Sequence, residues 1–286
     1  MRQKTIGQQQ TNKQTNKQTN KQTNNAILRP GRFDKYDLVF AIGAACPVST
    51  ILQAHNLRLM SSPIDWTDGE LPVNWEETNI WRDTRFLEKI NAIATKFHDF
   101  FNYEDFIVRR TYVADHYLHQ DMLNTRTRIR FSHLFPNNTS WELFFPTAKQ
   151  IINRRSERLL RAIDQSDRIL ICWAHRLGDQ RNLMDAPVSD ADVIQGAEIM
   201  KKIYPGKEID FVFFEHDGTK DKFEYEKICV CDGAYRIRSN HFILETGYMA
   251  KYNYWDKRHR PILCIAEALD NISLTDKLKT LGMDES

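Results

Sequence analysis

Residues 168–174 read RILICWA and residues 209–215 read IDFVFFE, and a helical pattern occupies residues 191–204 between them. Both short runs are predominantly apolar, which is typical of buried strands. Ser189 or Asp190 supplies an N-cap for the helix that separates them. Strands that alternate with helices of this length predict an α/β fold in which helices flank a mostly parallel sheet.

The same alternation continues along the chain on both sides of this segment. Short apolar runs predict further strands at residues 37–43, 128–135 and 223–230. Amphipathic patterns predict helices at residues 81–97 and 147–163. Residues 260–266 fit either a strand or a buried helix. No Pro/Gly/Ser-rich linker interrupts the run, so we expect a single catalytic α/β domain.

The ends of the chain differ in composition from this expected domain. From Gln10 the sequence repeats QTNK with a period of four and offers no apolar position, so we expect residues 1–33 to form a disordered tail. The domain is expected over residues 34–275, and residues 276–286 form a short C-terminal tail. The 41% of hydrophobic residues in the chain is enough to build a core in a domain of this size.

The QTNK repeat also carries information about the gene. The four-base DNA unit CAAA, read in triplets, encodes Gln-Thr-Asn-Lys in that order. Tetranucleotide tracts of this kind resemble the slipped-strand switches that cause phase variation of surface-modifying genes in host-adapted bacteria. The alternative is a low-complexity extension that switches nothing.

The formal charge of +2 hides an acidic domain. The chain has 40 basic and 38 acidic residues, and seven of the basic residues but none of the acidic ones lie in residues 1–33. The remainder therefore has 33 basic and 38 acidic residues, a net charge of −5, and we expect no nucleic-acid partner. The chain lacks an apolar signal segment and any transmembrane run, and its five cysteines fit a reduced protein, so we expect a cytoplasmic location.

Cys46 follows the predicted strand at residues 37–43, and Pro47 comes directly after it. Proline favours the first turn of a helix, so Cys46 is expected at a helix N-terminus. There the helix dipole lowers a thiol pKa, and free backbone N–H groups can hold an oxyanion. A small packed core residue would suit the same position.

The segment at residues 37–66, DLVFAIGAACPVSTILQAHNLRLMSSPIDW, resembles the opening of a bacterial family of unknown function. That family is catalogued as papain-like cysteine peptidases and often occurs in surface-polysaccharide loci. The matching positions are Gly43, Cys46, Leu57-Arg58 and residues 62–66. This chain has Ala45 where the family often has Asn, and Ile64 where it has Phe. The resemblance implies that Cys46 is a nucleophile.

The family continues with a strand that runs into a His-Asp-Phe-like element and with a helix that carries paired arginines. In this chain IRFSHLF places His133 at that element, although FHDF at residues 97–100 offers His98 as an alternative. The resemblance implies that His133 is the base that accepts the thiol proton. It also implies substrate binding by Arg154 and Arg155.

A third group should orient the imidazole. We expect Asp65 in this role because it lies in the better-matched motif, with Asn137 and Glu142 as alternatives. An aspartate that follows a proline and precedes a tryptophan equally fits a turn or an N-cap.

Further polar residues follow the apolar strands. His175-Arg176 and Glu215-His216 stand at strand ends, where α/β proteins bind ligands, so we expect His175 and Arg176 to bind substrate in one crevice with His133 and Cys46. His116 and His119 have the spacing of two metal ligands on a possible helix at residues 115–121. No P-loop or Gly-x-Gly-x-x-Gly motif is present, and we expect neither a metal nor another cofactor.

These observations favour a cysteine-nucleophile hydrolase or acyl-transfer enzyme in a phase-variable surface-polysaccharide pathway. Its substrate would be a small molecule, a glycan or a peptide. One alternative is a glycosyl- or acyltransferase of lipopolysaccharide or capsule biosynthesis in which the cysteine is not catalytic. Another is a non-catalytic partner of that machinery.

Overall fold

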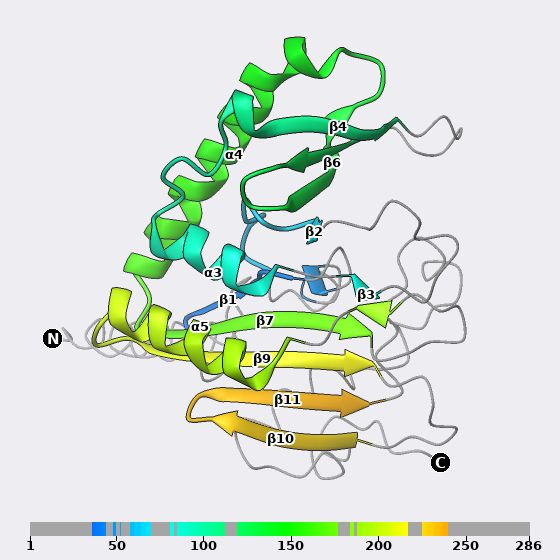
Figure 1. Cartoon of the computed structure of the whole chain (residues 1–286). Helices are drawn as coiled ribbons and strands as arrows, with labels where there is room; N and C mark the ends of the chain where they lie inside the picture. Colours follow the sequence, from blue (N-terminus) through cyan, green and yellow to red (C-terminus); the bar gives the residue numbers. More distant parts are fainter. Residues whose placement is uncertain are drawn as a thin grey trace, which may run out of the picture.

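The computed structural model describes 36–43, 48–49, 52, 58–69, 81–82, 85–111, 119–176, 184–185, 188–216 and 225–239. The expected tails at residues 1–33 and 276–286 and the segment at residues 260–266 lie outside these ranges. The described residues form a mixed α/β structure that contains a five-stranded sheet, a four-stranded sheet and a short two-stranded pair (Figure 1).

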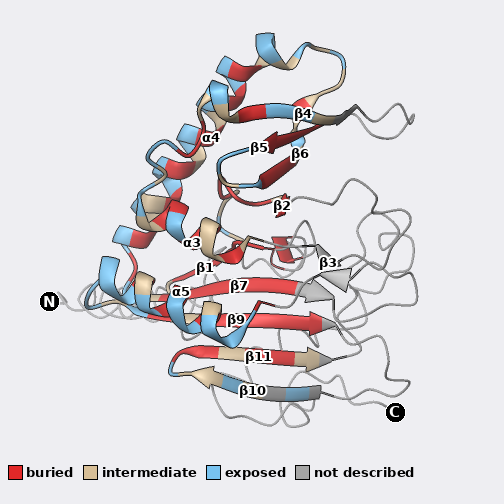
Figure 2. Cartoon of the chain, viewed as in Figure 1, coloured by how far each residue is buried: buried red, intermediate tan, exposed pale blue. Residues whose placement is uncertain are grey.

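The five-stranded sheet is mostly parallel, as the sequence predicts. Its order is β1 (Leu38–Ala41), β7 (Arg168–Arg176), β9 (Glu208–His216), β11 (Ala234–Ser239) and β10 (Tyr225–Cys231). Only β10 runs antiparallel to its neighbour. The central strands β7 and β9 are buried along most of their length, which explains their nearly continuous apolar sequences (Figure 2).

The four-stranded sheet is antiparallel and differs from the expected architecture. Its order is β2 (Thr67–Gly69), β6 (Ile129–Pro136), β5 (His119–Asn124) and β4 (Phe106–Thr111). The predicted strand at residues 128–135 is confirmed as β6, but it belongs to this second sheet. The possible helix at residues 115–121 is wrong at its described end, because His119 begins strand β5, and His116 lies outside the described residues.

The three predicted helices are confirmed with shifted bounds. They are α3 (Phe86–Ala94), α4 (Trp141–Asp164) and α5 (Asp190–Ile203), and a 3-10 turn, η2, covers Tyr103–Asp105. Trp81 and Arg82 at the predicted start of the first helix form strand β3 instead, which pairs with β8 (Met184–Asp185). Ser189 caps α5, and its hydroxyl accepts the Asp192 N–H at 3.1 Å.

Helices α3 and α5 cover one face of the parallel sheet, and α4 runs along the antiparallel sheet (Figure 1). Phe86 of α3 packs edge-on against Trp173 of β7, with ring centroids 5.3 Å apart. Lys89 of the same helix is fully buried, and its ammonium donates to the Thr67 carbonyl at 2.9 Å. Because the ammonium also lies 5.0 Å from the Trp173 ring centroid, Lys89 joins β2 of one sheet to β7 of the other.

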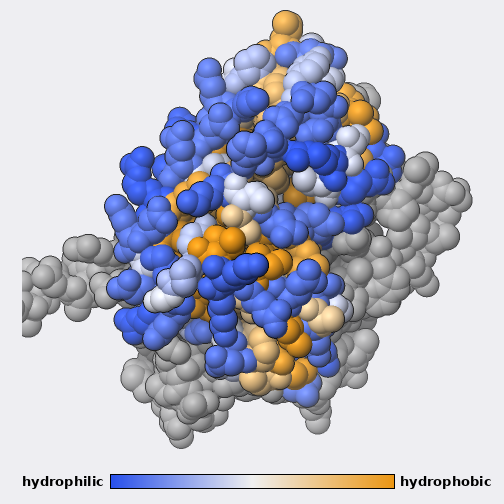
Figure 3. Space-filling model, turned by 60° about the vertical axis from the view of Figure 1, so that its left-hand side comes forward, coloured by the Kyte–Doolittle hydropathy of each residue, from blue (hydrophilic) through white to orange (hydrophobic). Residues whose placement is uncertain are grey.

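The surface over the helices is largely hydrophilic. In the view of Figure 3, hydrophobic residues gather near the middle of a predominantly hydrophilic face. Within the part of the chain that the structure describes, no helix is both long enough and apolar enough to span a membrane.

Candidate functional site

A pocket of about 280 Å³ opens between the antiparallel sheet, helix α4 and the turn that precedes β2. Three elements build its wall: the turn, strand β6 and helix α4. The lining residues are Pro63, Asp65, Trp66, Phe131, His133, Leu134, Ile152 and Arg155. The pocket therefore collects Asp65, His133 and Arg155 from sequence positions up to 90 residues apart.

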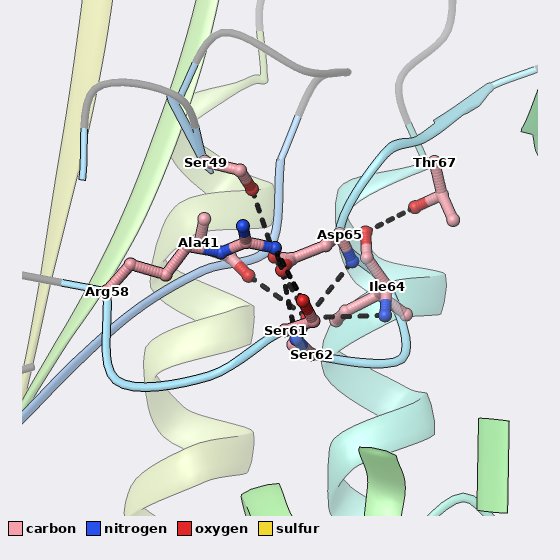
Figure 4. Close-up of polar contacts among 8 residues, drawn as sticks. All are labelled: Ala41, Ser49, Arg58, Ser61, Ser62, Ile64, Asp65 and Thr67. Atoms are coloured by element: carbon pink, nitrogen blue, oxygen red, sulfur yellow. Dashed lines mark hydrogen bonds and ion pairs between the residues drawn. The ribbon is translucent and has the colours of Figure 1, made fainter. Parts of the chain in front are cut away.

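Asp65 holds the loop that forms one side of the pocket. Its carboxylate accepts hydrogen bonds from the Ser49 hydroxyl at 3.0 Å and from the Ser62 N–H at 2.9 Å, and it forms an ion pair with Arg58 (Figure 4). The Ser62 hydroxyl lies 3.2 Å from the same carboxylate and 3.4 Å from the Ala41 carbonyl at the end of β1. These contacts tie the loop to the parallel sheet and to Ser49.

Among the described contacts, no hydrogen bond joins Asp65 to His133. The hydrogen bonds of Asp65 go instead to Ser49, Arg58 and Ser62, which are the partners of a buried carboxylate that organises a loop. The expected role of Asp65 as the group that orients the imidazole therefore has no supporting contact. The alternative Glu142 is exposed at the start of α4, where its carboxylate accepts the Ser140 hydroxyl at 2.5 Å.

Trp66 connects the loop to His133. Its backbone has a φ of 63°, in the left-handed region that a bulky residue rarely adopts. In this conformation the indole ring lies 5.9 Å from the His133 ring in an edge-to-face arrangement, and the Arg58 guanidinium lies 5.6 Å from the indole centroid. Trp66 thus contacts both a candidate base and the cation that neutralises Asp65.

His133 projects from β6 beside a second histidine, His119 of β5, with ring centroids 5.8 Å apart. His133 is exposed on the strand, but partial desolvation by the surrounding atoms lowers its pKa below the ordinary value. Repulsion by His119 lowers that pKa further, Asp68 raises it, and Arg130 lowers it. A lowered pKa favours the neutral imidazole, which is the form that can accept a proton.

The alternative base, His98, has a different setting. It lies in the turn after α3, where its side chain is 81% exposed and its Nδ1 is 2.9 Å from a carboxylate oxygen of the adjacent Asp99. It does not line the pocket formed by the described residues. The geometry favours His133 over His98.

The two adjacent arginines of α4 differ in burial: Arg154 is exposed and Arg155 is half-buried. Only Arg155 lines the pocket, whereas Arg154 is exposed. Burial lowers the pKa of Arg155, the nearby Asp65 raises it, and Arg58, Arg158 and Arg154 lower it. Across the described ranges, no hydrogen bond or ion pair reaches the Arg155 side chain.

His175 and Arg176 end strand β7, where the structure describes their backbone but not their side chains. The register sets them beside Glu215 and His216 of β9, so the backbone brings these residues to one edge of the parallel sheet. Glu215 is buried there and accepts a 2.6 Å hydrogen bond from Arg236. The expected crevice with His133 is not seen in the described residues, because His133 comes from the other sheet.

Cys46 lies outside the described residues, but the segments on both sides of it are described. Within the described ranges, no group of three or more His, Cys, Asp or Glu residues could hold a metal ion. We compared the chain with models of protein families, with curated proteins and with solved structures, and none of them matches it.

Sequence reasoning missed the parts of the site that depend on the loop. The roles of Ser49, Arg58 and Trp66 were not expected, although all three lie in the quoted segment at residues 37–66. The available signal was an aspartate that follows an arginine and two serines within seven residues. Its partners could be assigned only once the loop conformation was known.

Proposed function

We propose that the protein is a cysteine-nucleophile enzyme of the hydrolase or acyl-transfer type, with Cys46 as nucleophile and His133 as base. One observation carries the proposal: described residues before and after Cys46 contact the loop that forms one side of the pocket. On one side the Ala41 carbonyl lies within reach of the Ser62 hydroxyl, and on the other Ser49 donates to Asp65. Because three residues span at most about 11 Å, the chain keeps Cys46 within that distance of Ser49.

The chemistry needs only a neutral base beside the thiol. The His133 imidazole accepts the Cys46 proton while the sulfur forms a bond to the acyl carbon of the substrate. The bond from that carbon to the leaving group breaks, and the imidazolium returns its proton to the leaving group. Water, or an acceptor hydroxyl or amine, then takes the acyl group and restores the thiol.

The resemblance of residues 37–66 to a family from surface-polysaccharide loci supports an acyl-bearing glycan precursor as the substrate class. The CAAA-compatible repeat supports phase-variable expression of the gene. Substitution of Asp65 is expected to act through the loop, since its described contacts are with Ser49, Arg58 and Ser62.

Acylation by an activated ester tests the proposal. The wild-type protein is expected to release p-nitrophenolate from p-nitrophenyl acetate in a burst of about one equivalent, because acyl-enzyme accumulates. A Cys46→Ser variant is expected to lose the burst. A Cys229→Ser variant, which removes an exposed cysteine of β10, is expected to keep it.

The result would count against the proposal if Cys46→Ser kept the burst or if Cys229→Ser removed it. Absence of a burst, combined with an increase in melting temperature on addition of a nucleotide-sugar, would favour the transferase alternative.

A further inference from the structure

Arg155 has no ion-pair partner within the part of the chain that the structure describes. It is half-buried on α4, lines the pocket and has no hydrogen bond or ion pair among the described residues. Removing a guanidinium from water costs free energy unless hydrogen-bonding partners replace the water. Its five N–H donors match an oxyanion in a bidentate arrangement, so a bound oxyanion would supply the missing partner.

The charges around the pocket favour a negative ligand. The carboxylate of Asp65, which acts on Arg155, is already paired with Arg58 and hydrogen-bonded to Ser49 and Ser62. Arg154 and Arg158 lie close enough on α4 to repel the charge of Arg155. Arg58 is paired with Asp65, so Arg155 and its neighbours Arg154 and Arg158 leave an excess of positive charge near the pocket.

The remaining residues that line the pocket indicate what kind of ligand body would fit. The apolar surface of the pocket comes from five residues: Pro63, Trp66, Phe131, Leu134 and Ile152. A volume of about 280 Å³ lies just below the usual range for small-molecule sites, which is about 300–1,000 Å³. The pocket suits a compact molecule, or the end of a larger one, with one anionic group on a ring or an apolar body.

We propose that this pocket binds a carboxylate or phosphate group through Arg155, with the ring or apolar body of the ligand on the Trp66 side. The inference rests on the proposed function in taking this pocket as the substrate site. It narrows the substrate class to acyl compounds that carry an oxyanion. Ligand binding itself does not require Cys46 to react.

The test is isothermal titration of the full-length Cys46→Ser protein with benzoate, phenyl phosphate and the neutral analogue benzyl alcohol. At least one of the two anions is expected to bind, and more tightly than benzyl alcohol, and the stronger of the two identifies the oxyanion. Adding Arg155→Gln is expected to lower the affinity for that anion about 10- to 100-fold, which corresponds to the loss of a hydrogen bond to a charged group. The matched Arg154→Gln, on the exposed side of the same helix, is expected to change its affinity less than twofold.

Three results would overturn the inference: no binding of either anion, equal binding of benzyl alcohol, or equal loss in the Arg154→Gln and Arg155→Gln variants. An unchanged circular dichroism spectrum and melting temperature are expected for both variants, because neither side chain forms a described hydrogen bond or ion pair. Failure of anion binding with an intact ester burst would reject this inference alone. Anion binding through Arg155 without a burst would reject the proposed nucleophile and leave the site in place.

Discussion

Replacing Glu215 by alanine is expected to lower the free energy of unfolding by about 3 kcal/mol, the lower end of the range for breaking a buried ion pair. Glu215 is 1% exposed, and its carboxylate accepts hydrogen bonds from Arg236 at 2.6 Å and from Arg238 at 3.0 Å. Arg236 is buried as well, so the substitution leaves a desolvated guanidinium with less compensation. Asp190 and the Val188 carbonyl still bind Arg236, which limits the loss.

The matched control is Glu226→Ala. Glu226 is exposed on β10 and lies 3.6 Å from Arg238, which is the geometry of a surface ion pair worth about 0–1 kcal/mol. Urea unfolding at pH 7 measures both variants. Equal losses in the two variants would show that the buried cluster does not hold β9, β11 and the start of α5 together.

Replacing His133 by glutamine is expected to reduce acyl turnover about 10²- to 10⁴-fold, the usual contribution of a general base. Glutamine keeps a polar side chain of similar reach but cannot accept and return the proton. The initial rate of p-nitrophenyl acetate hydrolysis measures the effect, and the melting temperature verifies that β6 is intact.

The neighbouring His119 provides the control for this substitution. A His119→Gln variant keeps the base and removes a group that lowers the pKa of His133, so that pKa should rise toward its ordinary value. The hydrolysis rate of this variant at pH 8 is expected to equal that of the wild type, while the acidic limb of its pH–rate profile moves to higher pH. If His119→Gln and His133→Gln lost activity equally at pH 8, His133 would not be the base.

The parallel sheet could be predicted because its strands carry a local signal. RILICWA and IDFVFFE are apolar on both faces, since both faces of β7 and β9 are buried. Ser189 marked the start of α5 in the same local way. The start of α4 was missed because Pro146 lies inside the helix and interrupts the pattern five residues after Trp141.

The antiparallel sheet was missed because several of its buried residues are polar. In β5, with the sequence HQDMLN, Gln120, Asp121 and Asn124 are buried. Asp121 is 3.4 Å from Arg130 of β6, and the Asn124 side chain donates to the Phe100 carbonyl at 3.3 Å. These partners come from other elements, so a strand that depends on them shows no alternation of apolar and polar residues.

The candidate site likewise contains residues that the sequence predicted and contacts that only the fold reveals. The resemblance pointed to His133 and Arg155, and both line the pocket. The exposure of Arg154 was not anticipated, because it depends on how α4 is rotated against β6. The pairing of Asp65 with Arg58 depends on the conformation of one loop. The sequence motif contains both residues but does not indicate that they form an ion pair.

The pH dependence of Cys46 alkylation by iodoacetamide, followed by mass spectrometry of the Cys46 peptide, tests the central claim most directly. If His133 activates the thiol, the wild-type rate should reach half its maximum below about pH 6.5, since the lowered pKa keeps the imidazole neutral to more acidic pH than an ordinary histidine. The His133→Gln variant should shift that midpoint to about pH 8.5, the value of an ordinary thiol. A midpoint near pH 8.5 in both proteins would contradict the account.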